Sequence, residues 1–299
     1  MPHLAQDGAP RRGLSFEFFP PKTPAAAAQL WRSVERLAPL SPSYVSVTYG
    51  AGGTTRDRTK AAIKTIRDRA RLSVAGHLTC VDATREDTLG VARDYAAAGV
   101  RRIVALRGDA PKDTGHFTPH PQGFATAAEL VAALTAQGFD VTVAAYPERH
   151  PEAKTDADDI TALKTKVAAG ARSALTQFFF DTELFLRFRD RVAAAGIDIP
   201  IQPGILPVED FAKMVRFAAA CGTSVPGWMH DAFARAKTEA DAALLATAIA
   251  SEQCDTLLSE GVEHLHFYTL NKPDLTYDVC RAIGFVPAQL SEAMGQGAA

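Results

Sequence analysis

The chain is predicted to be an α/β protein that folds as a (β/α)8 TIM barrel. Three observations indicate this class: eight predicted strands alternate with helices, successive strands lie about 30 residues apart, and the chain has 299 residues. A closed barrel of this kind needs about 250 residues or somewhat more. An open doubly wound sheet is the alternative, because the same alternation builds it. We expect one domain over 1–299, with flexible ends at 1–13 and 287–299.

The strands are predicted from short runs of β-branched and aromatic residues that stop at glycine, proline or polar residues. The first run stops at Pro20 and Pro21, which cannot donate to a strand ladder. The seventh run stops in the same way at Pro203. The predicted strands cover residues 14–19, 44–48, 74–79, 103–106, 141–145, 174–180, 199–202 and 264–268.

The helices are predicted from apolar residues at helical spacing, together with start and stop signals. Thr23 is a cap residue with Pro24 at the first helical position, and Thr84 with Asp87 resembles a capping box. Gly99 stands where a glycine commonly ends a helix. The predicted helices cover residues 24–38, 56–71, 84–99, 125–137, 155–170, 185–196, 211–218 and 238–260.

Composition and charge favour a cytoplasmic protein that acts on small molecules. Lys and Arg number 32 against 34 Asp and Glu, and a net charge of -2 gives no reason to expect a nucleic-acid or membrane partner. No apolar run approaches the roughly 20 residues of a membrane span, and no secretory signal is recognisable. The four cysteines show no paired spacing, so we expect reduced thiols, no disulfide and no metal site built from them.

Glu17 is the first candidate catalytic residue. It lies in an aromatic run, beside Phe16 and Phe18, just before the prolines that end the strand. The carboxyl ends of parallel strands hold the chemistry of α/β folds. Burial there would raise the pKa of Glu17 and suit it to act as a general acid. An edge-strand glutamate that points to solvent is the alternative.

Other polar residues also fall at or just beyond predicted strand ends, which surround one mouth in a barrel. Arg107-Gly108-Asp109 follows a buried strand and predicts a cation for a phosphate and a carboxylate beside a reacting centre. The segment 110–122 that follows is too long for an ordinary connection, which is typical of functional loops. Besides Glu17, the residues at these ends are Thr48, His77, Arg107, Asp109, Tyr146 and Gln177.

Three further patterns have competing interpretations. The glycines of residues 50–53 follow a strand, but Thr55 replaces the third glycine of a dinucleotide fingerprint, so a Rossmann site is disfavoured. The loop histidines lack supporting carboxylates, so no metal site is predicted. Phe217 lies beside Lys213 and off the apolar stripe of its helix, which indicates either a stacking role or packing against a neighbouring helix.

Several motifs, in order, resemble those of the bacterial 5,10-methylenetetrahydrofolate reductase family, in its short form without a regulatory domain. The resemblance covers roughly residues 14–284. The motifs are Phe16-Glu17-Phe18-Phe19-Pro20-Pro21, Val47-Thr48-Tyr49-Gly50-Ala51-Gly52-Gly53, Leu106-Arg107-Gly108-Asp109, Ala145-Tyr146-Pro147-Glu148, Thr176-Gln177-Phe178-Phe179-Phe180-Asp181, Pro203-Gly204-Ile205-Leu206-Pro207 and His266-Phe267-Tyr268-Thr269-Leu270-Asn271.

The resemblance implies an FAD-dependent oxidoreductase of one-carbon metabolism and methionine synthesis. NADH or NADPH would donate a hydride to FAD in a ping-pong reaction, and methylenetetrahydrofolate would then receive it. Glu17 corresponds to the general acid that opens the folate ring, and Asp109 to the carboxylate near flavin and pterin. Gln177 corresponds to a folate and nicotinamide contact, and Phe217 to an aromatic residue that stacks on the substrates. We also expect a homo-oligomer.

The remaining correspondences concern the cofactor and the folate. Lys213 and Lys272 are assigned to substrate binding, with Lys272 in place of a common arginine. Ala162 and Thr165 replace the Asn and Arg that relatives often use against the flavin. The expected cofactor contacts are Thr48, Tyr49, Ala51, His77, Arg107, Gly108, Asp109, Tyr146, His150, Asp159 and Lys166.

Two other functions stay open from the sequence. A barrel glycoside hydrolase would use Glu17 and Asp109 as its acid and base pair. A non-catalytic flavin or folate carrier would keep the pocket without turnover, as the altered contacts at Ala162 and Thr165 suggest. A yellow protein would argue against the hydrolase, and bleaching of its colour by NADH would argue against the carrier.

Overall fold

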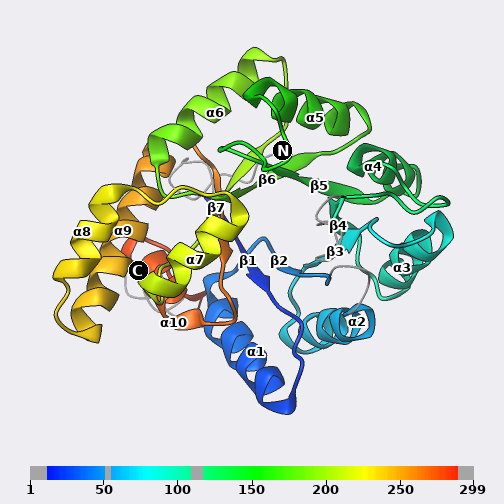
Figure 1. Cartoon of the computed structure of the whole chain (residues 1–299). Coiled ribbons are helices and arrows are strands. Elements are labelled where there is room, and N and C mark those ends of the chain that lie inside the picture. Colours follow the sequence, from blue (N-terminus) through cyan, green and yellow to red (C-terminus); the bar gives the residue numbers. More distant parts are fainter. Residues whose placement is uncertain (1–11, 51–54, 109–116, 289–299) are drawn as a thin grey trace, which may run out of the picture.

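The computed structural model describes residues 12–50, 55–108 and 117–288. In this part of the chain, parallel strands β1 to β8 pair in sequence order, and β1 also pairs with β8, which closes a barrel. The helices form a layer around the outside of the strands (Figure 1). The predicted (β/α)8 barrel is confirmed, and the open sheet is wrong.

Strands and helices alternate along the chain, with two extra helices after β7. The strands are β1 (Gly13–Phe18), β2 (Tyr44–Val47), β3 (Val74–Thr79), β4 (Arg102–Leu106), β5 (Asp140–Ala145), β6 (Ser173–Phe178), β7 (Ile201–Ile205) and β8 (His264–Tyr268). The helices are α1 (Pro24–Leu37), α2 (Arg56–Thr65), α3 (Arg85–Ala97), α4 (Ala127–Ala136), α5 (Asp156–Ala168), α6 (Thr182–Ala194), α7 (Phe211–Cys221), α8 (Gly227–Arg235), α9 (Glu239–Ser259) and α10 (Pro273–Ala282), with short turns η1 (Ala38–Leu40) and η3 (Ile66–Ala70).

The sequence explains where the helices begin. Thr23 Oγ1 accepts a hydrogen bond from the amide of Ala26, and Thr84 Oγ1 accepts one from the amide of Asp87, so both residues cap their helices as predicted. In place of the reciprocal bond of a capping box, the Thr84 hydroxyl donates to the Asp87 carboxylate at 2.6 Å. Thr155 and Asp158 form the reciprocal capping box that starts α5. These side chains satisfy amide groups that have no partner in the first turn of a helix.

Alternation along the strands separates the helix-facing core from the barrel interior. Phe16 and Phe18 pack into the large apolar core, whereas Ser15 and Glu17, which alternate with them, face the inside of the barrel. The interior below the mouth contains an apolar layer that includes Tyr44. A strand that ends in Phe-Glu-Phe therefore buries its rings on one face and aims its carboxylate into the site.

The seventh strand differs from its prediction. It covers Ile201–Ile205 instead of 199–202 and continues through Pro203, while β6 ends at Phe178 instead of 180. The pairing register between β6 and β7 shifts between Leu175 and Phe178. This irregularity removes the ladder bond that a proline could not make, so Pro203 is tolerated inside the strand.

Other boundaries also differ from expectation. Gly13 was placed in a flexible end, but its amide donates to Glu263 O and starts β1. Helices α8 and α10 were not predicted, because each is short and its apolar pattern is brief. Of the predicted flexible ends, residues 1–11 and 289–299 lie outside the described residues, whereas 12, 13, 287 and 288 are described. Among the described residues, none of the helices has the length and apolar character that crossing a bilayer requires.

Candidate functional site

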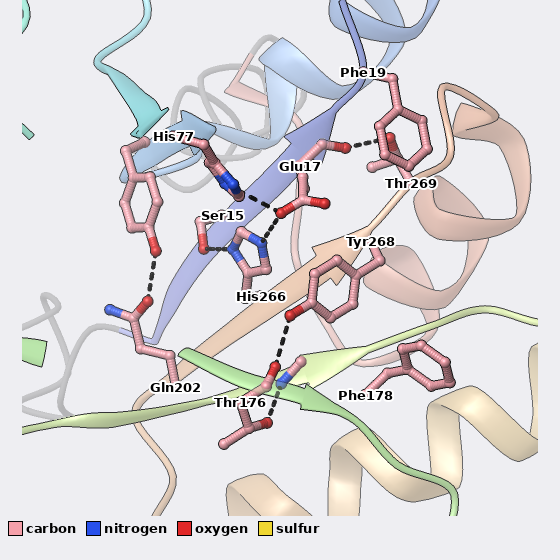
Figure 2. Close-up of polar contacts among 12 residues, drawn as sticks. Ser15, Glu17, Phe19, His77, Thr176, Phe178, Gln202, His266, Tyr268 and Thr269 are labelled. Carbon is pink, nitrogen blue, oxygen red and sulfur yellow. Dashed lines mark hydrogen bonds and ion pairs between the residues drawn. The ribbon is translucent and has the colours of Figure 1, made fainter. Parts of the chain in front are cut away.

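Glu17 lies at the mouth of the barrel between two histidines from other strands. Its Oε2 atom lies 3.3 Å from Nε2 of His77 on β3 and 3.8 Å from Nε2 of His266 on β8 (Figure 2). The Glu17 side chain is 10% exposed, and both imidazoles are buried. Thr269 fixes the backbone here by donating its hydroxyl to Glu17 O at 2.6 Å. We call Glu17, His77 and His266 the acid cluster.

The charge state of Glu17 differs from the sequence expectation. Burial does raise its pKa, as expected, but the two imidazoles act more strongly in the opposite direction, and together the effects lower the pKa to about 2. The prediction of a raised pKa is therefore wrong, because no local pattern indicates that β3 and β8 bring imidazoles to the same carboxylate. At neutral pH Glu17 is ionised in this arrangement, and it needs a proton before it can act as an acid.

Ser15 and His264 extend the acid cluster into the barrel, and neither was predicted as a site residue. Ser15 Oγ lies 2.7 Å from Nδ1 of His266 and 2.8 Å from Nε2 of His264. Figure 2 shows Ser15 and His266 beside Glu17. The signal for this group was present in the sequence, since His264 and His266 alternate on one strand and so share a face.

A cavity of about 600 Å³ opens beside the acid cluster, over the ends of β4 and β5. Thr79 lines it, and His77 lies two residues earlier on the same face of β3, so the cavity and the acid cluster share a wall. The strand residues that line the cavity include Ala105 on β4 and Ala144 on β5, whose small side chains leave space for a ligand. The predicted cofactor residues that line it are Tyr49, Arg107, Gly108, Tyr146, His150, Asp159 and Lys166.

Two cations face this cavity, and each has a protein partner in the described structure. Arg107 makes a bidentate pair with Glu152, with nitrogen to oxygen distances of 2.5 and 2.8 Å. Lys166 Nζ donates to Ala144 O at 2.5 Å. Burial lowers the pKa of Lys166 to about 8, although Asp159 partly opposes this effect. A buried ammonium without a full counter-charge favours the arrival of an anion.

Other groups fix the shape of the cavity wall. Asp159 accepts a hydrogen bond from the amide of His150 at 3.0 Å, and the rings of His150 and Tyr146 meet edge to face at 4.6 Å. Gly108 has φ +92°, and a Cβ there would lie 2.6 Å from Val81 Cγ1. Only glycine fits this position, so the chain passes close to the cavity without filling it.

These features suit a large phosphorylated cofactor with a flat ring. Cations supply charge for phosphate, aromatic side chains supply apolar faces, and alanines with Gly108 allow close backbone approach. Ala162 and Thr165, the two departures from the family pattern, both line the cavity. Among the predicted cofactor contacts, Thr48 and His77 are described but are not part of this lining, while Ala51 and Asp109 lie outside the described residues.

A second group of predicted residues lies across the mouth on β6, α7 and β8. Phe217 is 42% exposed and stacks on Phe178, with ring centroids 5.3 Å apart and an interplanar angle of 19°. Phe178 also meets Tyr268, and Tyr268 meets His266 at 5.3 Å. Rings therefore connect the acid cluster with the exposed face of Phe217. Tyr268, which donates to Thr176 O, was missed as a site residue.

The other predicted substrate residues have protein partners in the described structure. Gln177 on β6 accepts a hydrogen bond from the amide of Phe178 at 3.1 Å. Lys213 pairs with Asp210 at the start of α7, and Lys272 lies 3.9 Å from Glu209. Both lysine side chains are more than half exposed, so they remain accessible to an anionic ligand. Within the described ranges, no group of three His, Cys, Asp or Glu side chains is arranged to hold a metal ion.

Comparisons with known proteins point to one family. The family model for methylenetetrahydrofolate reductase matches residues 4–284. A 5,10-methylenetetrahydrofolate reductase from Pectobacterium carotovorum is 48% identical over 93% of this chain and 92% of its own length, and one from Escherichia coli K12 is 47% identical over 92% and 91%. A methylenetetrahydrofolate reductase (NADH) 1 from Zea mays is 32% identical over 95% of this chain, which spans 50% of that protein.

One solved structure has a similar fold. An uncharacterised protein from Clostridium thermocellum, described as binding two copies of 5-methyl-5,6,7,8-tetrahydrofolic acid, has a TM-score of 0.61 to this chain at 13% identity. The match covers 91% of this chain and 94% of that protein. At this identity the likeness concerns the barrel alone.

Proposed function

The chain belongs to the methylenetetrahydrofolate reductase family and is an oxidoreductase with that activity, and we propose that it uses FAD and the residues of the barrel mouth to transfer a hydride from NADH or NADPH to 5,10-methylenetetrahydrofolate. The observation that supports this best is the acid cluster, which shares a wall with a cavity that contains two cations. A glycoside hydrolase gains no support from the family match.

The residues of the cavity suit the parts of FAD. Arg107 and Lys166 would hold phosphate oxygens, and the buried ammonium of Lys166 gains the counter-charge that it lacks in the cavity. Tyr146 and the glycine backbone at Gly108 would meet the flat ring. Bound FAD supplies the hydride chemistry, by accepting a hydride from the nicotinamide and returning it to the folate.

Glu17 is proposed as the acid for the folate. Opening the five-membered folate ring requires a proton on a ring nitrogen, and a positioned acid contributes about 10²- to 10⁴-fold to such a step. His77 and His266 stabilise its carboxylate form, so they hold Glu17 in place and favour the loss of its proton to the folate. Asp109 is assigned a charge near the flavin and pterin on the basis of the family motif.

The aromatic side of the mouth is proposed to bind both substrates in turn. Phe217 presents an exposed ring that is held in place because it stacks on Phe178. Gln177 is the proposed polar contact for folate and nicotinamide, and Lys213 and Lys272 are suited to the carboxylates of the folate tail. Thr48 is the proposed further contact for nicotinamide. Because nicotinamide and folate would bind against the same face of the flavin, nicotinamide must leave before folate enters.

One experiment tests the cofactor and the reaction together. The purified protein is expected to be yellow or to become so with FAD, to bleach when NADH or NADPH is added without oxygen, and to regain colour when methylenetetrahydrofolate follows. Colour that does not bleach with either nicotinamide would instead support the carrier alternative. We further propose a cytoplasmic homo-oligomer, which light scattering of the holoenzyme would test.

Glu17→Gln separates the two half-reactions, because it keeps size and polarity but removes the transferable proton. Bleaching by NADH needs no proton from Glu17 and should stay within a few-fold of the parent. Return of colour with the folate should slow by roughly 10² or more, which is about 3 kcal/mol of barrier. Equal slowing of both half-reactions would mean that Glu17 positions the flavin instead.

A further inference from the structure

A line of polar side chains runs inside the barrel, away from the mouth. It passes from His266 Nδ1 to Ser15 Oγ at 2.7 Å, and from Ser15 Oγ to His264 Nε2 at 2.8 Å. His264 is the first residue of β8, so it lies at the end of the barrel opposite the mouth. The line therefore connects the buried acid cluster with the N-terminal face of the barrel.

The far end of the line is more open than the rest. His264 is partly exposed, whereas Ser15 and His266 have exposed fractions of 0%. The Tyr44 ring stacks on His264 with centroids 5.7 Å apart, and Arg102 lies over the Tyr44 ring while it pairs with Asp140. Burial, together with the charges of His266 and Arg102, lowers the pKa of His264 to about 3, so its ring is neutral at neutral pH.

The hydrogen bonds of the line have one arrangement that serves an ionised Glu17. A neutral His264 donates its Nε2 proton to Ser15 Oγ, and Ser15 donates its hydroxyl proton to His266 Nδ1. His266 then has its proton on Nε2, which points toward Glu17 at 3.8 Å. Among the described residues His266 Nε2 is buried without a hydrogen-bond partner. The Nε2 proton of His266 therefore adds no stabilising hydrogen bond until the Glu17 carboxylate comes closer.

The reaction creates a need for such a line. Under the proposed function, on which this inference rests, the cofactor and the folate cover the mouth while Glu17 gives its proton to the folate. The Glu17 side chain is only 10% exposed even without them, so water at the mouth is a poor source for the next proton. A route from the opposite end of the barrel is unaffected by bound substrate.

We propose that His264, Ser15 and His266 deliver a proton from the N-terminal face of the barrel to Glu17. Glu17 takes the Nε2 proton of His266, His266 takes the hydroxyl proton of Ser15 at Nδ1, and Ser15 takes the Nε2 proton of His264. His264 takes a proton at Nδ1 from a water molecule, which leaves as hydroxide into solvent at the N-terminal face. Each relay group is neutral before and after, so the low proton affinity of a buried imidazole does not block the transfer. The hydroxyl and rings then reorient.

The test uses the FAD-loaded enzyme in rapid mixing. His264→Phe keeps a ring that stacks on Tyr44 but removes both ring nitrogens, and Ser15→Ala removes the hydroxyl link. Bleaching by NADH should be unchanged in both variants. The folate half-reaction should slow by roughly tenfold or more, and the loss should grow as pH rises because fewer protons reach Glu17 by other routes.

Deuterated water gives a readout that a structural role would not move. In the parent, a plot of the folate half-reaction rate against the deuterium fraction of the solvent should be curved, because several protons move in the same step. In either variant this dependence should become linear. The double variant should be no slower than Ser15→Ala alone, since both changes break the same path.

Thr142→Val is the matched control. It removes a buried hydroxyl that meets Ser173 Oγ at 2.9 Å and, in the described contacts, no member of the line, so both half-reactions should keep their rates. Folate rates in His264→Phe and Ser15→Ala within about twofold of the parent, or equal loss in both half-reactions, would overturn the proposal. A parent enzyme that fails to bleach with NADH would instead overturn the proposed function.

Discussion

Removing the buried charge of Lys166 should stabilise the flavin-free protein. Lys166 lines the cofactor cavity with its side chain partly buried, and its ammonium donates to Ala144 O. Burial lowers its pKa from 10.5 to about 8. Lys166→Met keeps the length of the side chain but has no charge to desolvate. We therefore expect a larger free energy of unfolding for the variant at neutral pH.

The size of the effect follows from the pKa. A fall from 10.5 to about 8 means that the charged lysine destabilises the folded state by about 3 kcal/mol at pH 7. Loss of the hydrogen bond to Ala144 offsets about 1 kcal/mol, which leaves a net gain of about 2 kcal/mol. Because the folded pKa lies below the unfolded one, wild-type stability recovers as pH rises from about 8 toward 10.5. The advantage of Lys166→Met should therefore nearly vanish by about pH 9.5.

Urea unfolding of flavin-free protein at about pH 7 and about pH 9.5 measures this difference. Lys164→Met is the matched control, since Lys164 is an exposed lysine on the same helix and donates only to Ala195 O in the described contacts. The control should change stability little at either pH. A Lys166→Met variant whose stability relative to the parent is the same at both pH values would refute the reasoning.

Three further predictions concern the ligands. Arg107→Ala should speed the loss of FAD on dilution. Glu152→Gln should slow this loss by roughly three- to tenfold, because the Glu152 carboxylate competes with phosphate for Arg107. Fluorescence of the released flavin measures both rates, and equal effects of the two variants would contradict the competition. Asp109→Asn should slow the folate half-reaction, since its charge would stabilise a developing cation; unchanged rapid-mixing traces would remove it from the site. Phe217→Leu should raise the folate KM several-fold at unchanged stability, since the ring is 42% exposed; an unchanged KM with lower stability would make it a packing residue.

The barrel was predictable because its signals are local. Prolines, glycines and capping residues marked most boundaries, as at Thr23 and Thr84. The failures occurred where a tertiary contact overrides the local rule. Pro203 appeared to end a strand, but the bulge against β6 lets the strand continue.

The site was predictable in outline because residues at strand ends meet at one mouth. Glu17 and His77 came together as that rule requires. The charge of Glu17 was not predictable, since it depends on His266, which is more than 200 positions away in the sequence and joins β1 only when the barrel closes. Glu152 was missed for a similar reason, because nothing in its loop sequence indicates that it will face Arg107.

The polar interior also affects which strand pairings the chain accepts as it folds. Barrel interiors are commonly filled by Val, Ile and Leu, which tolerate many neighbours. Here Tyr44 on β2 reaches Gln202 on β7, and Ser15 on β1 joins two histidines of β8. A strand displaced by two residues would still turn the same faces inward but would separate these partners and bury them unpaired, at about 1–3 kcal/mol each. The interior therefore favours the native register at the moment of barrel closure, because a misaligned β1–β8 pairing would leave these polar groups buried without their partners.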